Sequence, residues 1–404
     1  MLHPRLTLTL LMLALLRSAV SAADSDPTRV DPDRLARIDA VVQSALDRKE
    51  LPGAVILIVH RDEVVFRKAY GHRALKPEAV EMTPDTLFDL ASLTKPVATA
   101  TSIMILLEQG KFSLSDRVAK HWPAFGDNGK NKITVEQLLL HTSGLMADND
   151  VADYKEGKEK ALERIAAIAP QSEPGAKFVY SDVGYIVLGE LVERIAGVPL
   201  DEFAKKNVFD PLGMKETTYR PKDSLKDRAA PTQQRDDKWM QGEVHDPRAF
   251  ALGGVAGHAG LFSTADDLAI YARMLLHGGV HNRKRVLSPL AVRLMTTPRE
   301  VPGGLRALGW DVQSAFSSNR GELFPHGEGF GHTGFTGTSI WIDPGSDTAV
   351  IFLSNRVHPD GKGNVMKLRG QVATLAAAAL LDVPAKPGRP VTSSPLHPAN
   401  LPPP

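Results

Sequence analysis

The sequence of 404 residues contains no cysteine. Disulfide bonds, a thiol nucleophile, a zinc site built on thiolates and a lipid anchor on an N-terminal cysteine are therefore all excluded. There is also no excess of one charge, because 48 basic and 47 acidic side chains leave a formal net charge of +1. A chain so close to neutrality has no general electrostatic attraction to nucleic acid or to anionic membranes.

No apolar run reaches the roughly twenty residues that a membrane-spanning helix needs. The apolar stretch Leu6–Leu16 is too short, but it follows Arg5 and precedes the small residues Val20-Ser21-Ala22. This order is typical of a secretory signal peptide. The sequence therefore predicts a signal peptide at residues 1–22 and a periplasmic or secreted mature protein.

Two common catalytic signatures are absent as well. There is no G-x-S-x-G motif, which argues against the nucleophile elbow of an α/β-hydrolase, and there is no H-E-x-x-H motif. Residues 329–334 match G-x-G-x-x-G, but they lead into a predicted strand instead of opening a helix. A bound dinucleotide is therefore not expected.

The mature chain shows no internal repeat and no linker that would divide it. We expect one domain over residues 23–382, followed by a proline-rich tail at 383–404 without a role in the core. Strand patterns near both ends of this domain enclose a mainly helical subdomain within about residues 97–300. The simplest assembly is an α/β (α+β) fold, with a sheet built from both chain ends and helices on its faces.

Hydrophobic periodicity predicts the individual elements. Apolar residues from Leu35 to Leu46 recur at helical spacing, and Pro52-Gly53 closes that helix. Two strands, Ala54–His60 and Glu63–Tyr70, follow around a tight Arg61-Asp62 turn. The remaining predicted elements are helices at Val97–Leu107, Lys158–Ala169, Val183–Ala196 and Val365–Leu381, and strands at Thr336–Ile342 and Thr348–Leu353.

The most informative stretch is Ala91-Ser92-Leu93-Thr94-Lys95. A serine and a lysine three residues apart lie about one turn apart on one face of a helix. That spacing places an amine or ammonium beside a hydroxyl, which is how a weak alcohol nucleophile is activated. We expect both side chains in the first turn of the buried helix Val97–Leu107. Ser-x-x-Lys alone is a common pattern, so the other motifs decide its meaning.

Two further motifs follow. Tyr180-Ser181-Asp182 precedes a predicted helix, and His332-Thr333-Gly334 leads into a strand predicted at Phe335–Ile342. Lys95 is either a base, if burial makes it neutral, or a charged group that lowers the pKa of a nearby tyrosine such as Tyr180. A strand beside the serine offers a backbone N–H for an oxyanion and side chains for the substrate. Taken singly, each motif also fits a packed aromatic or a simple turn.

Together, these residues resemble the serine β-lactamase and penicillin-binding protein superfamily. The resemblance is closest to the class C branch, which includes D-amino-acid peptidases and family VIII carboxylesterases. Ser92-Leu93-Thr94-Lys95, Tyr180-Ser181-Asp182 and His332-Thr333-Gly334 match the family's three motifs in order and spacing. The likeness spans about residues 35–381 and implies the β-lactamase/transpeptidase-like fold, whose sheet is antiparallel. Flanking phrases agree too: Phe88-Asp89-Leu90-Ala91, His141-Thr142-Ser143-Gly144-Leu145 and Gly260-Leu261-Phe262-Ser263-Thr264.

The resemblance implies a role for each motif residue. Ser92 would be the acylated nucleophile, with Lys95 and Tyr180 as the proton-transfer pair. The oxyanion hole would consist of the backbone N–H groups of Ser92 and Phe335. An acyl-enzyme would form and then be hydrolysed by water, with no metal or cofactor. The residues implied to bind the substrate are Asp182, His332, Thr333 and Gly334.

Two residues depart from the family's pattern. Asp182 stands where asparagine is usual, and an ionised carboxylate can only accept hydrogen bonds. Our hypothesis is that Asp182 pairs with Lys95, keeps it protonated and leaves Tyr180 as the base. His332 stands where lysine is frequent and is expected to titrate near neutrality, so carboxylate recognition would be weaker and pH-dependent. Both departures argue against an efficient β-lactamase.

The sequence thus favours an exported serine hydrolase that forms an acyl-enzyme at Ser92. A D-Ala-D-Ala carboxypeptidase, or another D-amino-acid peptidase, competes with an esterase, acting on a small-molecule or peptidoglycan-derived substrate. The alternative is a non-catalytic muropeptide binder or sensor on the same fold. The glycine-rich loop Gly253–Gly260 either lines the pocket or is a structural turn. His258 is not expected to ligate zinc, because no second ligand stands at helical spacing.

Overall fold

The computed structural model describes residues 29–383. The signal peptide expected at 1–22, and all but the first residue of the proline-rich tail expected at 383–404, lie outside the described residues. Among residues 29–383, no helix combines the length and the apolar character needed to cross a membrane.

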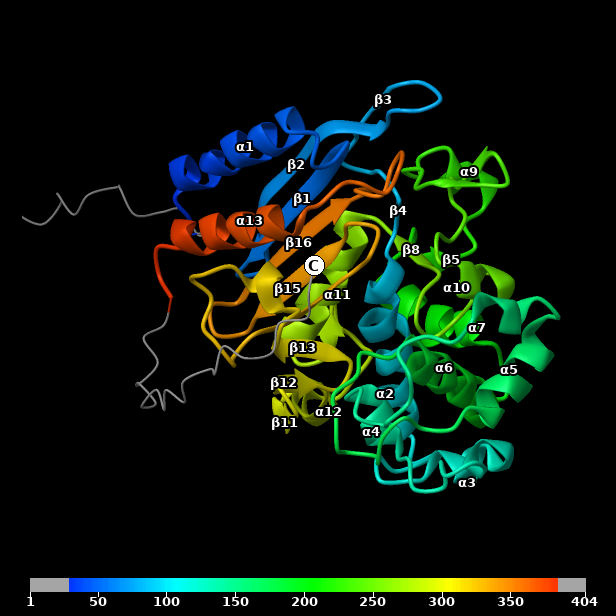
Figure 1. The fold of residues 1–404 in the computed structure, drawn as a ribbon. Helices are drawn as coiled ribbons and strands as arrows, with labels where there is room; N and C mark the ends of the chain where they lie inside the picture. Colours follow the sequence, from blue (N-terminus) through cyan, green and yellow to red (C-terminus); the bar gives the residue numbers. More distant parts are fainter. Residues whose placement is uncertain (1–28, 384–404) are drawn as a thin grey trace, which may run out of the picture.

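A nine-stranded sheet forms the centre of the molecule (Figure 1). Every adjacent pair of strands is antiparallel, in the order β11-β12-β13-β14-β15-β16-β1-β2-β3. Both ends of the chain contribute strands, which confirms the predicted architecture. The strands are β1 (Gly53–His60), β2 (Glu63–Ala74), β3 (Val80–Glu81), β11 (Arg299–Val301), β12 (Gly304–Ala307), β13 (Trp310–Gln313), β14 (Phe330–Thr333), β15 (Ser339–Asp343) and β16 (Thr348–Ser354).

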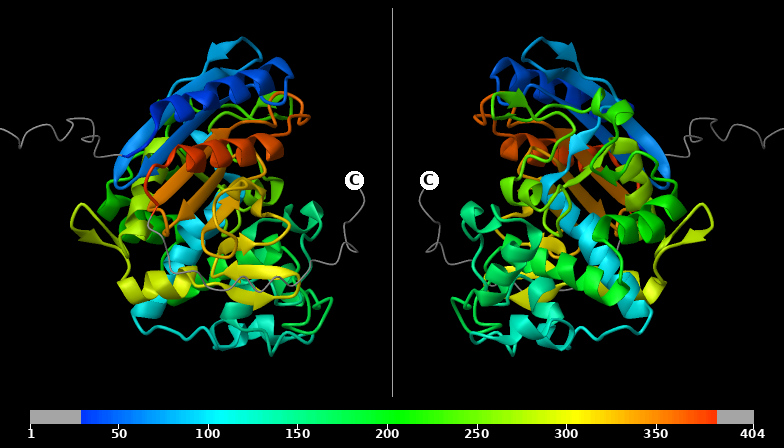
Figure 2. Two further views of the ribbon diagram at one scale, coloured as in Figure 1. Left: turned by 90° about the vertical axis from the view of Figure 1, so that its left-hand side faces the viewer. Right: turned by 90° about the vertical axis from the view of Figure 1, so that its right-hand side faces the viewer.

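Strand β1 is buried along its whole length because both faces of the sheet are covered. Its side chains alternate between two hydrophobic cores, as the two-residue period of a strand requires. Ile56 and Ile58 belong to the core beneath α1 (Pro32–Asp47) and α13 (Met366–Ala379). The other core lies on the opposite face, where α11 (Ala265–Leu276) packs against β1 and β16 (Figure 2). It receives Val55, Leu57 and Val59 from β1.

A mainly helical part lies beside the sheet (Figure 1). Its helices are α2 (Thr101–Glu108), α3 (Val118–His121), α4 (Val135–Leu139), α5 (Lys158–Ala167), α6 (Asp182–Ala196), α7 (Leu200–Ala204), α8 (Asp210–Leu212), α9 (Asp223–Lys226), α10 (Pro247–Ala251) and α12 (Pro289–Thr296). Shorter turns are the 3₁₀ segments η1 (Ala91–Leu93), η3 (Pro123–Gly126), η4 (Val151–Tyr154) and η6 (Ser317–Arg320), and the π-helical segments η2 (Lys95–Ala100) and η5 (Lys205–Phe209).

Small sheets complete the structure. A three-stranded sheet has the order β4-β8-β5. Its strands are β4 (Phe88–Asp89), β8 (Leu261–Ser263) and β5 (Thr218–Tyr219). Two hairpins pair β6 (Gln234–Arg235) with β7 (Lys238–Trp239) and β9 (Val280–His281) with β10 (Lys284–Arg285).

The predicted helix Val97–Leu107 is correct in place but wrong in its first turns. Ser92 lies in the separate 3₁₀ turn η1, and Lys95 begins the π-helical turn η2, which continues into α2. Pro96 explains the irregularity, because proline has no N–H to donate and its ring crowds the carbonyl of the preceding turn. The Pro96 carbonyl accepts from the backbone N–H of Thr101 and also from its hydroxyl, the latter at 2.9 Å.

The strand predicted at Phe335–Ile342 is also wrong at its start. His332 and Thr333 are already the last residues of β14, and β15 begins only at Ser339. Residues 334–338 form a tight turn between the two strands, closed by a hydrogen bond from Gly334 N–H to Thr338 O at 2.7 Å. Two adjacent antiparallel strands thus take the place of one longer strand.

Candidate active site

Ser92 is positioned by the β4 segment that precedes it. Strand β4 pairs with β8, so the two sequence phrases around Asp89 and Phe262 lie side by side. The buried Asp89 carboxylate accepts hydrogen bonds from the N–H groups of Ala91 at 2.8 Å and His245 at 2.7 Å, and its burial raises its pKa to about 6. Ala91 has φ of +46°, a left-handed conformation that is unfavourable for alanine. The bond to Asp89 holds that turn and aims Ser92.

Lys95 is fully buried beside Ser92. Its Nζ lies 2.9 Å from Ser92 Oγ, 3.1 Å from the His258 carbonyl oxygen and 2.7 Å from Asp182 Oδ1. The contacts to Ser92 and to the His258 carbonyl are hydrogen bonds donated by the ammonium, and the contact to Asp182 is an ion pair. The expected pairing of Asp182 with Lys95 is therefore present in the structure.

Two opposing effects act on the pKa of Lys95. Burial disfavours its charge and lowers the pKa, while the negative charge of Asp182 and the hydrogen-bonding contact with Tyr180 favour the ammonium. The charge interactions outweigh burial, so the pKa lies above its ordinary value. Of the two states that the sequence left open, the structure favours the protonated lysine.

Tyr180 and Asp182 lie at the start of α6, where the Ser181 side chain caps the helix by accepting from Gly184 N–H at 3.0 Å. The Tyr180 ring is stacked on His141, with centroids 4.5 Å apart, and its other neighbour is Phe316 at 5.4 Å. Lys95 Nζ lies 4.9 Å from the Tyr180 ring centre. The Tyr180 hydroxyl is buried next to this ammonium and has no well-aligned hydrogen-bond partner within residues 29–383.

The third motif is fastened to the segment that carries Ser92. The Thr336 hydroxyl donates to Asp89 O at 2.7 Å, and the Thr338 hydroxyl donates to Leu90 O at 3.0 Å. From α13, the half-buried Arg369 donates to the carbonyls of Gly334 and Thr338. These bonds fix the turn containing the Phe335 N–H relative to the Ser92 N–H.

The Phe335 side chain points outward and is 60% exposed. Its ring stacks on His245 at 5.6 Å, and the Arg356 guanidinium lies 4.5 Å from the ring centre. Arg356 also donates to the Phe335 carbonyl at 2.9 Å. The backbone of Phe335 is therefore held from outside the turn.

His332 differs from the sequence-based expectation. It is buried, and its Nδ1 lies 2.9 Å from the Thr333 carbonyl oxygen. Burial and the positive charges of Arg306 and Lys95 place its pKa well below 6.5. The prediction that His332 titrates near neutrality is therefore wrong, because the sequence does not reveal its burial or the neighbouring charges.

A cavity of about 170 Å³ brings several predicted residues together. Asp182 and Lys95 lie directly behind Ser92, while Gly334 supports the turn. Sequence reasoning missed Arg306, Asp311 and Phe316, which no local motif marks. Larger hollows on the described surface, such as one of about 710 Å³ beside Trp239, contain none of the motif residues. The cavity is lined by Ser92, Tyr180, Arg306, Asp311, Phe316, His332, Thr333 and Phe335.

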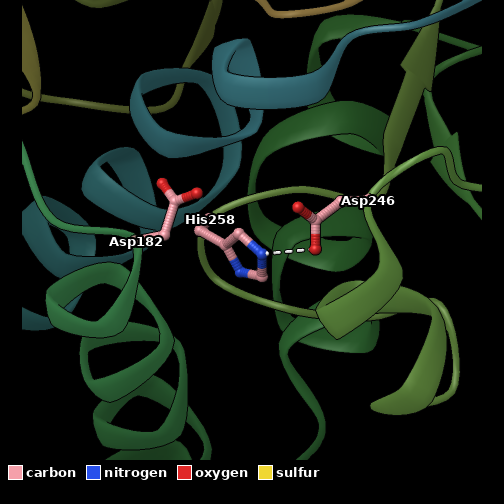
Figure 3. A group of neighbouring side chains, drawn as sticks. All are labelled: Asp182, Asp246 and His258. Atoms are coloured by element: carbon pink, nitrogen blue, oxygen red, sulfur yellow. Dashed lines mark hydrogen bonds and ion pairs between the residues drawn. The ribbon is translucent and has the colours of Figure 1, made fainter. Parts of the chain in front are cut away.

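Asp182 also belongs to a cluster with Asp246 and His258 (Figure 3). One potential ligand atom from each residue lies within 4.8 Å of the others. Among residues 29–383, this is the one group of His, Asp or Glu side chains close enough together to hold a metal ion. Each carboxylate already has a partner: Asp182 pairs with Lys95 at 2.7 Å, and Asp246 Oδ1 lies 2.9 Å from His258 Nε2. The arrangement therefore fits two neighbouring pairs better than an open metal site.

Comparison with known proteins identifies relatives over most of the chain. The family model described as Beta-lactamase matches residues 38–374. A protein of Escherichia coli (strain K12), named "Putative D-alanyl-D-alanine carboxypeptidase", is 33% identical over 397 residues, covering 87% of this chain and 91% of that protein. A protein of the same name from Salmonella heidelberg (strain SL476) is 32% identical and covers 87% of this chain and 90% of its own length.

Solved structures share the fold. A penicillin-binding protein homologue from Caulobacter crescentus has a TM-score of 0.70 at 26% identity, covering 87% of this chain and 99% of that chain. EstCE1, a hydrolase with promiscuous acyltransferase activity, has a TM-score of 0.69 at 25% identity, covering 86% of this chain and 99% of that chain. The extent of the family match and the identity to the curated relatives decide the classification: this chain belongs to the β-lactamase family and is a serine hydrolase of that family.

Proposed function

We propose that Ser92 is the nucleophile and that the residues around it transfer its proton. The observation that carries this proposal is the position of Lys95 Nζ, between Ser92 Oγ at 2.9 Å and Asp182 Oδ1 at 2.7 Å. A lysine held protonated in this way cannot remove a proton, so Tyr180 takes the role of base. The ammonium orients the serine hydroxyl and stabilises the Tyr180 phenolate, which becomes neutral as it takes the proton of Ser92.

The backbone N–H groups of Ser92 and Phe335 form the proposed oxyanion hole. Two such donors stabilise the charge that develops on the carbonyl oxygen as Ser92 attacks. The Ser92–substrate ester forms as the leaving group departs with the proton from Tyr180, and water then attacks the ester by the reverse proton path. Asp182, His332, Thr333 and Gly334 remain the proposed substrate-binding and supporting residues around this centre.

The proposed substrate is a peptide ending in a D-amino acid, and the proposed reaction is removal of that residue. The names of the curated relatives support a D-alanyl-D-alanine carboxypeptidase activity. The cavity of about 170 Å³ is of the size of a small leaving group, and the Thr333 side chain lines it. A peptidoglycan-derived substrate would be met in the periplasm, so we also propose export through residues 1–22 and a single hydrolase domain over residues 23–382.

A small ester is the second candidate substrate. His332 is neutral and buried, so it supplies no charge for a substrate carboxylate. The exposed rings of Phe316 and Phe335 at the cavity favour an apolar group, and the similarity to EstCE1 supports this reading. Both substrates use the same acyl-enzyme chemistry.

Intact mass spectrometry after brief incubation with benzylpenicillin tests the proposal. We expect an adduct on the wild-type protein that maps to Ser92 and is absent from Ser92→Ala. An adduct points to peptides with a free carboxylate, whereas Ser92-dependent turnover of an activated ester without an adduct points to esters. If the protein turns over no activated ester and forms no adduct, the rival function as a muropeptide binder or sensor replaces the enzyme.

A further inference from the structure

The glycine-rich loop Gly253–Gly260 lies with its backbone against the turn that carries Lys95. Lys95 Nζ donates to the His258 carbonyl at 3.1 Å, and the Thr99 hydroxyl donates to the Gly257 carbonyl at 2.6 Å. One of the three acceptors of the Lys95 ammonium is therefore a backbone atom of this loop. Its position depends on whatever fixes the loop.

Close packing fixes one side of the loop. A Cβ atom at Gly257 would collide with the Tyr185 carbonyl and with the backbone of Gly189, both in α6. Glycine is therefore required at this position for the loop to approach the helix. The packing holds the loop against α6, but it does not orient the next residue, His258.

The His258 side chain fixes the other side. It is fully buried, and its Nε2 lies 2.9 Å from Asp246 Oδ1 (Figure 3). Asp246 is itself held at the N-terminus of α10, where it accepts from Ala249 N–H at 2.8 Å. Burial alone would raise the pKa of Asp246, but His258, the Ala249 N–H and Arg248 lower it below its ordinary value. The carboxylate is thus a fixed, ionised anchor for the imidazole.

We propose that His258 and Asp246 are a positioning pair for Lys95. The pair anchors the His258 backbone so that its carbonyl stays in line with one N–H of the ammonium. The ion pair with Asp182 and the bond to the His258 carbonyl hold the ammonium in the position from which it donates to Ser92 Oγ. This inference rests on the proposed function, because it assumes that Lys95 assists the chemistry of Ser92.

A fluorophosphonate probe, which phosphonylates activated serines, tests the pair. The rate of Ser92 labelling is followed by intact mass spectrometry in the wild type, His258→Ala and His258→Gln. We expect His258→Ala to lower the maximal labelling rate about tenfold to a hundredfold with unchanged apparent affinity for the probe. His258→Gln retains a side-chain N–H that can reach Asp246, and it is expected to recover most of that rate.

A matched control separates positioning from general stability. His60 is also buried, but it lies at the far end of β1 and contacts Thr348 at 2.9 Å. His60→Gln is expected to lower the melting temperature without changing the labelling rate. If His258→Ala does not fold, Asp246→Ser takes its place, because serine can still cap the helix while its shorter side chain withdraws the oxygen that contacts His258 Nε2. That variant is expected to slow labelling in the same way.

Four results would overturn the proposed role of the pair. Folded His258→Ala that labels at the wild-type rate, or His258→Gln that is as slow as His258→Ala, removes the positioning role and leaves the proposed function intact. Stoichiometric Zn²⁺ binding by the wild type that is lost in His258→Ala would assign the cluster to a metal instead. A wild-type protein whose Ser92 is not labelled at all refutes the proposed function, and the positioning role with it.

Discussion

At the scale of single residues, the site is governed by how burial and charge compete at Lys95. Burial alone can lower the pKa of a lysine by up to about 3–5 units. Asp182 at 2.7 Å reverses that effect and keeps the ammonium charged. A hydroxyl beside a permanent ammonium needs a separate base, which is why Tyr180 becomes important. The aspartate at position 182, where the family usually has asparagine, therefore keeps Lys95 protonated.

Asp182→Asn tests this balance. Without the carboxylate, burial dominates and the pKa of Lys95 falls. Because the proposed mechanism needs the protonated lysine, the activity of the variant is expected to be lost at a lower pH on the basic side of its pH–rate profile than that of the wild type. The profile of an activated ester, measured for both proteins, checks this. A basic-limb pKa and a rate that both stay unchanged contradict the pairing.

His332 gives a second prediction at this scale. Since its pKa lies well below 6.5, it stays neutral in the folded protein at ordinary pH. The KM for a D-alanine-terminated peptide is therefore expected to be constant between about pH 6 and 8, where an exposed histidine would titrate. Steady-state kinetics across this range provide the measurement. A KM that rises with pH through neutrality would show that His332 is charged when it meets the substrate.

At the scale of elements, the important feature is the fastening of the β14–β15 turn to β4. The hydroxyls of Thr336 and Thr338 donate to the carbonyls of Asp89 and Leu90, the residues just before the Ser92 turn. The two N–H groups proposed for the oxyanion hole lie on these two fastened segments. If these groups form the proposed oxyanion hole, small shifts between the segments would misalign the donors, and the catalytic rate would depend on bonds that touch no substrate.

Thr338→Val removes one of these bonds and keeps the shape of the side chain. We expect a loss of about 1 kcal/mol in unfolding free energy and a fall in kcat with little change in KM. Thr348→Val is the matched control, because its buried hydroxyl donates to Ser346 O at the distant end of the sheet. Urea denaturation gives the unfolding free energy of both variants, and ester kinetics give their kcat and KM. Equal effects on kcat would mean that the bond acts only through stability.

At the scale of the whole molecule, the sheet joins two cores into one structure. In strand β1, Ile56 packs in the core beneath α1 and α13, and Leu57 packs in the core that continues into the helical part. Because one rigid strand takes part in both cores, damage to either core is transmitted to the other. This continuity supports the proposal of a single domain over residues 23–382.

Ile56→Ala and Leu57→Ala test that continuity. Each deletes buried methyl and methylene groups and is expected to cost about 2–5 kcal/mol of unfolding free energy. Thermal unfolding is then followed by far-UV and near-UV circular dichroism. We expect one coincident transition at a lower temperature for both variants. Two separated transitions in either variant would show that the cores unfold as independent units.

Sequence alone determined the features that depend on local pattern. The helix Leu35–Leu46, the strands around Arg61-Asp62 and the final helix are confirmed, because amphipathic period and turn residues are local signals. The motifs around Ser92, Tyr180 and His332 also indicated the family before any coordinates. The sequence shows Pro96, but it does not predict the π-helical turn, in which Thr101 N–H donates to the Pro96 carbonyl.

Tertiary structure alone decided the electrostatic state of the site. Asp182 and the His258 carbonyl reach Lys95 from positions 87 and 163 residues further along the chain, and Arg306 acts on His332 across the sheet. The neutrality of His332 and the pairing of His258 with Asp246 follow only from such distant neighbours, whereas the sequence already suggested the pairing of Asp182 that keeps Lys95 protonated. Burial and charge are set by what packs around a group, and a linear pattern does not contain that information.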